Sequence, residues 1–200
     1  MTSVRTRVRA VLVGTAFVGA AAAPAVASAQ SVMLGATLNQ AQEVPPSGSP
    51  ATGFGTLMWN AAGGGTLMVQ LSFTGLTSQT IPVPPPSGAP AHIHFAPPGS
   101  NGPIVLPLSF VPVGVTSFSG SSTFSGAALN ADLVAELNRV ASLPVGTFSN
   151  LYFNVHTSGF AGGEIRGNLA VAVVPEPSTY ALVGAGLAGV AGFARRRRRA

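Results

Sequence analysis

Hydrophobic and polar residues alternate in several short stretches of the chain, and residues 66–73 show this pattern most clearly. Leu67, Val69, Leu71 and Phe73 alternate there with threonine, methionine, glutamine and serine. Successive side chains of a strand point to opposite faces, so this stretch predicts a strand with one buried face and one wet face. The pattern is typical of an antiparallel sheet.

Further strand-like stretches are separated by turn residues. Glycine, proline, asparagine and serine cluster between them, and residues 60–65, with three successive glycines, predict a hairpin turn. The other expected strands span residues 32–38, 53–59, 91–95, 104–108, 116–124, 148–157 and 163–172. This succession predicts a mainly β fold, an antiparallel β-sandwich or barrel of about eight strands, with one short helix.

The helix is expected at residues 130–143. Asn130 can cap its free N–H groups, and Asp132 suits the positive end of the helix dipole. Its apolar face is formed by Leu133, Leu137 and Val140. Asp132 and Glu136 are expected to face solvent, and Glu136 to form a surface ion pair with Arg139.

The formal net charge of +5 comes from the two ends of the chain. Three arginines lie among the first nine residues and five among the last six. Between residues 30 and 174, two arginines (Arg139 and Arg166) stand against four acidic residues, a net charge of −2. A nucleic-acid-binding surface would require a basic patch on the folded body. Nucleic acid is therefore excluded as a partner.

The chain contains no cysteine, and all of its ten basic residues are arginines. Disulfides, thiolate metal sites and cysteine nucleophiles are excluded.

The N-terminal residues 1–29 have the organisation of a secretory signal peptide. Three arginines precede an apolar run over residues 10–23, and Ala27 and Ala29 flank Ser28 as a small-x-small cleavage site. We expect cleavage by signal peptidase before Gln30 and secretion across the inner membrane. The alternative is an uncleaved anchor, for which the apolar run is short.

The C-terminal residues 174–200 form a second processing segment. Pro175, Glu176 and Pro177 precede an apolar run at 180–194 and an arginine block at 195–199. This order resembles the PEP-CTERM sorting signal of Gram-negative bacteria. The resemblance implies recognition by an exosortase, transient membrane anchoring through the apolar helix, and final release or attachment at the cell surface. The alternative is a plain C-terminal anchor, which needs no Pro-Glu-Pro.

The body between these segments, residues 30–173, resembles a CHRD domain, a module common in bacterial secreted proteins. The similar motifs are Gln42-Glu43-Val44-Pro45-Pro46, Ala91-His92-Ile93-His94, Asn101-Gly102-Pro103-Ile104-Val105, Tyr152-Phe153-Asn154-Val155-His156-Thr157 and Gly163-Glu164-Ile165-Arg166-Gly167. The family carries no well-defined biochemical activity, so the resemblance indicates a fold more than a function.

All three histidines of the chain lie in two of these motifs. His92 and His94 are two residues apart and would share one face of a strand, and His156 lies in a second strand-like run. Three imidazoles on neighbouring strands are suited to a copper or zinc site. The sequence favours a structural role, in which the rings hydrogen-bond to each other, to Glu164 or to loop carbonyls.

Three further charged residues are candidates for a ligand site or a structural role. Glu164 and Arg166 would share one strand face, and an internal salt bridge is the favoured interpretation. Glu43 is a candidate partner for Arg166.

We therefore expect a non-catalytic, exported protein that binds or scaffolds exopolysaccharide or surface proteins. The second hypothesis is a metal-binding protein, and the third is an enzyme acting on an extracellular polymer. No carboxylate pair or serine elbow typical of hydrolases is evident in the sequence. Apart from a candidate copper or zinc ion, no cofactor is expected.

Overall fold

The computed structural model describes residues 31–83 and 88–173. The predicted signal peptide with its cleavage site and the predicted sorting segment lie outside the described residues, as does part of the proline-rich loop before His92.

The described chain contains eight strands, three short 3-10 turns and one α-helix. The strands are β1 (Ser31–Asn39), β2 (Thr52–Asn60), β3 (Thr66–Thr74), β4 (Ala91–Phe95), β5 (Ile104–Pro107), β6 (Phe118–Ser125), β7 (Phe148–Val155) and β8 (Ile165–Ala172), and the helix is α1 (Ala131–Val140). The 3-10 turns are η1 (Gln40–Gln42), η2 (Ala62–Gly64) and η3 (Gly126–Ala128). The predicted mainly β fold with one short helix is confirmed.

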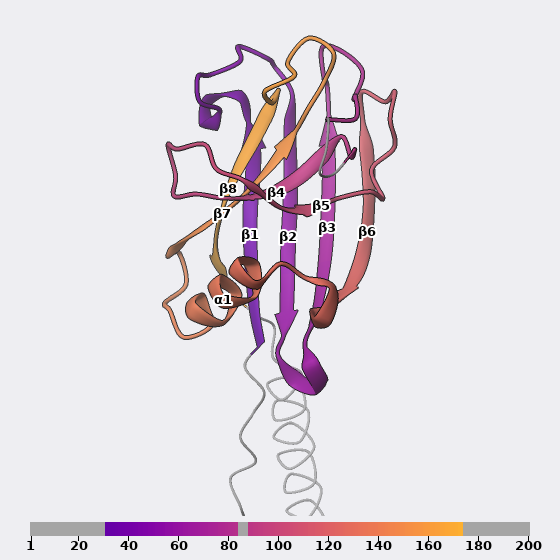
Figure 1. The fold of residues 1–200 in the computed structure, drawn as a ribbon. Helices are drawn as coiled ribbons and strands as arrows, with labels where there is room; N and C mark the ends of the chain where they lie inside the picture. The colour runs from indigo at the N-terminus through magenta and orange to yellow at the C-terminus, as the bar shows by residue number, and fades with distance from the viewer. Residues whose placement is uncertain (1–30, 84–87, 174–200) are drawn as a thin grey trace, which may run out of the picture.

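All eight strands belong to one antiparallel sheet with the order β5-β4-β7-β8-β1-β2-β3-β6. The sheet curls into a half-barrel, so that β4 and β5 cross the face of β1–β3 (Figure 1). Strand twist accumulates across a wide sheet and brings its two halves face to face. The sheet thus folds over on itself, and a single sheet encloses the core without a second sheet packed against it.

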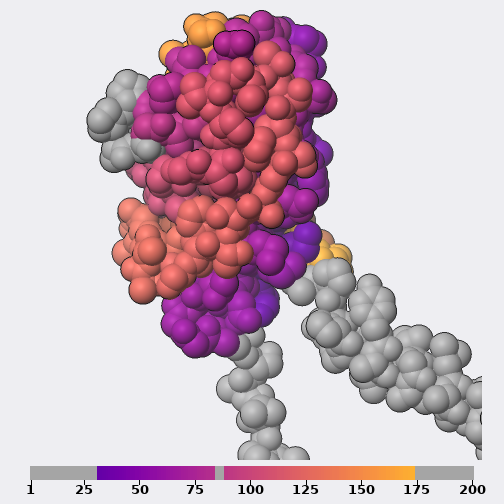
Figure 2. All heavy atoms as spheres, turned by 90° about the vertical axis from the view of Figure 1, so that its right-hand side faces the viewer, coloured from indigo at the N-terminus to yellow at the C-terminus, as the bar shows by residue number. Residues whose placement is uncertain are grey.

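The inner face of this curled sheet carries the alternating apolar residues. In β3, Leu67, Val69, Leu71 and Phe73 are at most 3% exposed, whereas Thr66, Met68 and Gln70 are exposed. The strand β6 forms the opposite edge from β5 and lies at the surface seen in Figure 2. The alternation predicted from the sequence is therefore the alternation between core and solvent.

Strands β4, β7 and β8 differ, because they are buried on both faces. Their inner face joins the hydrophobic core through residues such as Ile93, Phe153 and Ile165. Their other face is covered by loops and carries several buried polar side chains, among them His92, His94, Asn154 and Arg166. The candidate site lies on this covered polar face.

Helix α1 begins as predicted, since the Asn130 side chain accepts a hydrogen bond from the Asp132 N–H at 2.8 Å. It ends at Val140, earlier than expected. Glu136 does not face solvent: it is 4% exposed and accepts hydrogen bonds from Arg139 and from the Asn150 N–H. Burial alone would raise the pKa of Glu136, but these hydrogen bonds outweigh it and lower the pKa. The carboxylate thus ties the helix to β7.

No helix among the described residues is long and apolar enough to cross a membrane.

The contact between Gly55 of β2 and Phe153 of β7 tests the closure of the sheet. A Cβ added to Gly55 would lie 2.5 to 2.9 Å from three atoms of the buried Phe153 ring. We expect Gly55→Ala to lower the free energy of unfolding by about 1–3 kcal/mol, because the Phe153 ring is 0% exposed and must shift to make room for the methyl group. Denaturant unfolding of the full chain measures this. Gly162→Ala is the control, since nothing lies within 4 Å of its added Cβ; equal stability of both variants would contradict this packing.

Candidate metal centre

The strand register brings the three histidines onto one face. His92 pairs with Asn154 and His94 with Tyr152 across β4 and β7. Paired residues of antiparallel strands share a face, and side chains two apart on a strand do too. His156 follows Asn154 by two residues, and its N–H extends the ladder by donating to the Pro90 carbonyl at 2.8 Å. All three imidazoles therefore lie over the covered face of β4 and β7.

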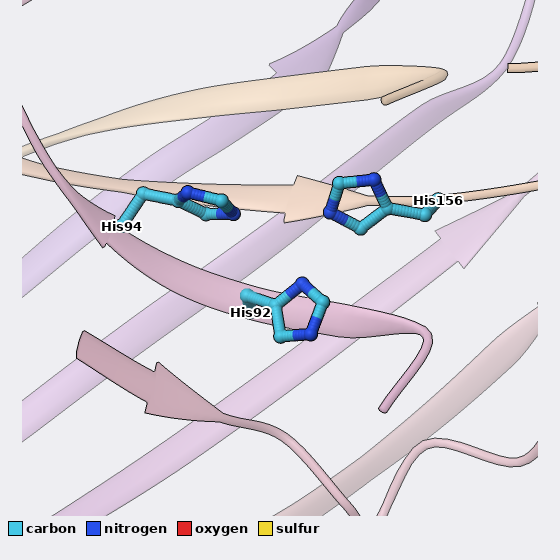
Figure 3. A group of neighbouring side chains, drawn as sticks. All are labelled: His92, His94 and His156. Atoms are coloured by element: carbon cyan, nitrogen blue, oxygen red, sulfur yellow. The ribbon is translucent and has the colours of Figure 1, made fainter. Parts of the chain in front are cut away.

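The three rings converge at close range. One nitrogen from each ring lies within 4.8 Å of the others. In Figure 3 each ring directs a nitrogen toward the space between the three side chains. His92, His94 and His156 are 0%, 8% and 4% exposed, so the cluster is buried. Convergence of this kind is the arrangement expected of a three-imidazole metal site.

Two of the rings are anchored through their other nitrogen. His94 Nδ1 donates to the Gly102 carbonyl and His156 Nδ1 donates to the Ala161 carbonyl, each at 2.9 Å. These bonds fix the tautomer, so that Nε2 of both rings carries a lone pair. Neither Nε2 has a hydrogen-bond partner among the described residues. Metal-binding histidines typically donate their second ring nitrogen to a carbonyl in this way.

Electrostatics keep the imidazoles neutral. Burial, together with the smaller effects of the neighbouring His156 and His94, lowers the pKa of His92 to about 3. Burial also lowers the pKa of His156 to about 4, against the opposing effect of its hydrogen bond to Ala161. Burial likewise lowers the pKa of His94, with a smaller contribution from the positive charge of Arg166. Neutral imidazole is the form that coordinates metals.

Tyr152 lies between His94 and Arg166 on this face. Its ring stacks on His94 with centroids 4.9 Å apart and planes 13° from parallel. The Arg166 guanidinium carbon lies 3.4 Å from the centroid of the same ring. The guanidinium also donates to side chains of Asn168 and Asn101 and to the Pro97 carbonyl. Arg166 is 0% exposed, so these contacts hold a buried cation in place.

Glu164 organises loops and does not pair with Arg166. Its carboxylate accepts from Ser49 Oγ, from the N–H and hydroxyl of Thr77 and from Thr157 Oγ1 at 2.6 to 2.9 Å. Burial would raise its pKa, but these four hydrogen bonds lower it. Among the described residues the one ion pair within 4.0 Å is Glu136–Arg139. The salt bridge expected between Glu164 and Arg166 is therefore wrong, because each finds neutral partners instead.

Glu43 lies beside a surface pocket of ≈ 360 Å³ lined also by Pro45, Asn101, Phe160 and Gly163. It is 5% exposed, and its Oε1 has no hydrogen-bond partner among the described residues. Burial raises the pKa of Glu43 to about 7, and the positive charge of Arg166 opposes this rise. Arg166 acts on Glu43 through space, without an ion pair within 4.0 Å.

Sequence reasoning missed the role of Tyr152 and the loop residues that hold Glu164. Alternation backward from His156 places Asn154 and then Tyr152 on the histidine face, so the sequence did carry a signal for Tyr152. Ser49 and Thr77 carry no such signal, since they lie in loops 115 and 87 residues away from Glu164 in the chain.

Comparison with known families identifies both parts of the chain. A CHRD domain model matches residues 34–169, and a PEP-CTERM protein-sorting motif matches residues 173–199. The chain therefore belongs to the CHRD domain family and carries an exosortase sorting signal. The motif implies processing by exosortase and export toward the cell surface or extracellular space. Searches among curated proteins and among solved structures found no match.

The raised pKa of Glu43 predicts a pH-dependent contribution to stability. The folded state holds the Glu43 proton more tightly than the unfolded state, where the pKa is near 4.5. The contribution is therefore complete below pH 4.5 and is lost as the pH rises through 7. Between pH 5 and 8 we expect the free energy of unfolding of the wild type to fall by up to roughly 3 kcal/mol relative to that of Glu43→Gln.

Chemical denaturation of the full chain across this pH range measures the difference. Glu136→Gln is the control: the pKa of Glu136 is lowered, so its contribution is lost only as the pH falls below 4.5. Parallel stability curves for wild type and Glu43→Gln from pH 5 to 8 would refute the prediction.

Proposed function

We propose that the chain is a non-catalytic extracellular protein, sorted by exosortase, whose CHRD domain binds one transition-metal ion through His92, His94 and His156. The observation that carries the proposal is the convergence of three buried, neutral imidazoles within 4.8 Å. Copper and zinc are the candidate ions, because both accept imidazole nitrogen.

The Nε2 atoms of His94 and His156 have no hydrogen-bond partner among the described residues, which favours a metal ion over a purely structural cluster. Because Nδ1–H of His94 and of His156 donates to a carbonyl, both Nε2 atoms are acceptors and cannot hydrogen-bond to each other. A buried acceptor without a donor costs about 1–3 kcal/mol. A metal ion would satisfy both Nε2 atoms at once, whereas a purely structural cluster leaves them unsatisfied.

One observation supports the non-catalytic part of the proposal, and it concerns Glu164. Glu164 is saturated by four hydrogen bonds from Ser49, Thr77 and Thr157, which leaves it no role as a general base. Delivery by the sorting signal would bring the domain to exopolysaccharide or to surface proteins, which are the partners we propose for a scaffolding role.

Metal analysis of the full chain, purified without a polyhistidine tag, tests the site. We expect one copper or zinc ion per chain after incubation with the metal and removal of excess. His92→Ala should reduce bound metal to below about a tenth, because two ligands hold an ion far less tightly than three.

Ile93→Val is the matched control. Ile93 lies between the two histidines on β4 but faces the core, so this variant costs about 0.5–1.5 kcal/mol of stability without touching a ligand. Equal metal content in wild type and His92→Ala would overturn the proposal.

The sorting assignment has its own test. Deletion of residues 175–200 removes the sorting motif and the arginine block. The truncated chain should be absent from the cell fraction in which the exosortase-processed full chain accumulates. Fractionation of the producing cells into membrane, surface and medium, followed by immunoblotting, measures this. The Glu176→Ala variant, which alters the Pro-Glu-Pro alone, distinguishes motif recognition from loss of the tail; an unchanged distribution of both variants would count against sorting by this motif.

A further inference from the structure

The proposed metal ligands provide no negative charge. Among the described residues the group of potential ligands consists of three imidazoles, and all three are neutral in the folded chain. Glu164 is engaged with serine and threonine donors, and Glu43, whose Oε1 and the Asn154 amide both lie next to Gly163, is not one of the converging ligands. An ion bound by these three side chains receives no negative charge from its ligands.

Burial penalises a divalent ion far more than a monovalent one. The energy of transferring an ion out of water rises with the square of its charge, so a dication loses about four times as much hydration energy as a monocation of equal size. Proteins normally offset this loss with carboxylate, thiolate or hydroxide ligands. The chain has no cysteine, and the described group contains no carboxylate.

A fixed cation close to the site increases the preference for a monovalent ion over a divalent one. Arg166 contacts one face of Tyr152, and His94 stacks on that same ring at 4.9 Å. The guanidinium is buried and held by Asn168, Asn101 and the Pro97 carbonyl, so it cannot move away. Its repulsion acts twice as strongly on a dication as on a monocation.

The number of ligands points in the same direction. With three histidine ligands Zn²⁺ would still need a water or another group in its fourth position, and Cu²⁺ prefers square-planar or tetragonal surroundings. Three converging nitrogens suit a trigonal monovalent ion. Metal–nitrogen distances of about 2.0 Å place such nitrogens about 3.5 Å apart, so a small inward rotation of the rings completes the site.

We infer that the three-histidine centre is selective for monovalent copper, Cu⁺, over Zn²⁺ and Cu²⁺. The inference rests on the proposed metal-binding function and specifies its ligand. No electron transfer is part of it: the ion binds in the reduced state and dissociates in the same state.

Competition for metal by the full, untagged chain tests the selectivity. Under anaerobic conditions with ascorbate, the chain competes for Cu⁺ with bicinchoninate; in parallel it competes for Zn²⁺ and for Cu²⁺ with chromophoric chelators. We expect Cu⁺ to bind about 100-fold or more tightly than Zn²⁺. Ag⁺, a monovalent ion that needs no reductant, should occupy the same site and displace Cu⁺, whereas His156→Ala should bind neither.

Two variants of Arg166 test the charge argument. Arg166→Gln removes the positive charge and should reduce the preference for Cu⁺ over Zn²⁺ by about tenfold, whereas Arg166→Lys should preserve it. If Arg166→Gln does not fold, the competition with the wild-type chain still decides the question.

The outcomes separate the two proposals. Binding of Zn²⁺ or Cu²⁺ as tightly as Cu⁺ overturns the selectivity but leaves metal binding in place. Failure of all three ions and of Ag⁺ to bind overturns the proposed metal-binding function together with the selectivity.

Discussion

The structure depends on the burial of one polar sheet face. Strands β4, β7 and β8 present histidine, tyrosine, asparagine and arginine side chains on the face opposite the core, and loops cover that face. Buried polar groups are costly unless they are hydrogen-bonded, so each covering loop must supply partners. The hydrogen bonds between the loops and these buried polar groups therefore hold the loops in place. Glu164 shows this most directly, because its side chain and backbone bind donors from two loops distant in the chain.

The same requirement orders the histidine cluster. Gly102 supplies the carbonyl that holds His94, and its N–H donates to the Tyr152 hydroxyl at 3.1 Å. A Cβ on Gly102 would collide with the Phe95 carbonyl, so the close approach of this loop requires glycine. Tyr152 in turn links His94 to Arg166. Loop, aromatic ring and cation thus form one connected set around the imidazoles, which preorganises the nitrogens.

Predictions from local pattern succeeded where the physical cause is local. The alternation in β3 reflects core and solvent, and Asn130 caps α1 through atoms only two residues apart. The prediction for Glu136 was wrong because its burial depends on β7 packing against the helix, which helical periodicity does not contain. The salt bridge between Glu164 and Arg166 was wrong for the same reason: strand alternation put them on one face but could not reveal the loop donors that compete for each.

The sequence by itself determined the mainly β architecture, the family and the sorting signal, because alternation, turn residues and short motifs are local properties of the chain. It also indicated that His92 and His94 share a face. Only the tertiary structure decided that His156 joins them, that Tyr152 lies between His94 and Arg166, and that the histidine cluster contains no carboxylate. Those features arise from strand register and loop packing between residues far apart in the chain, where the free energy of burial outweighs any local preference.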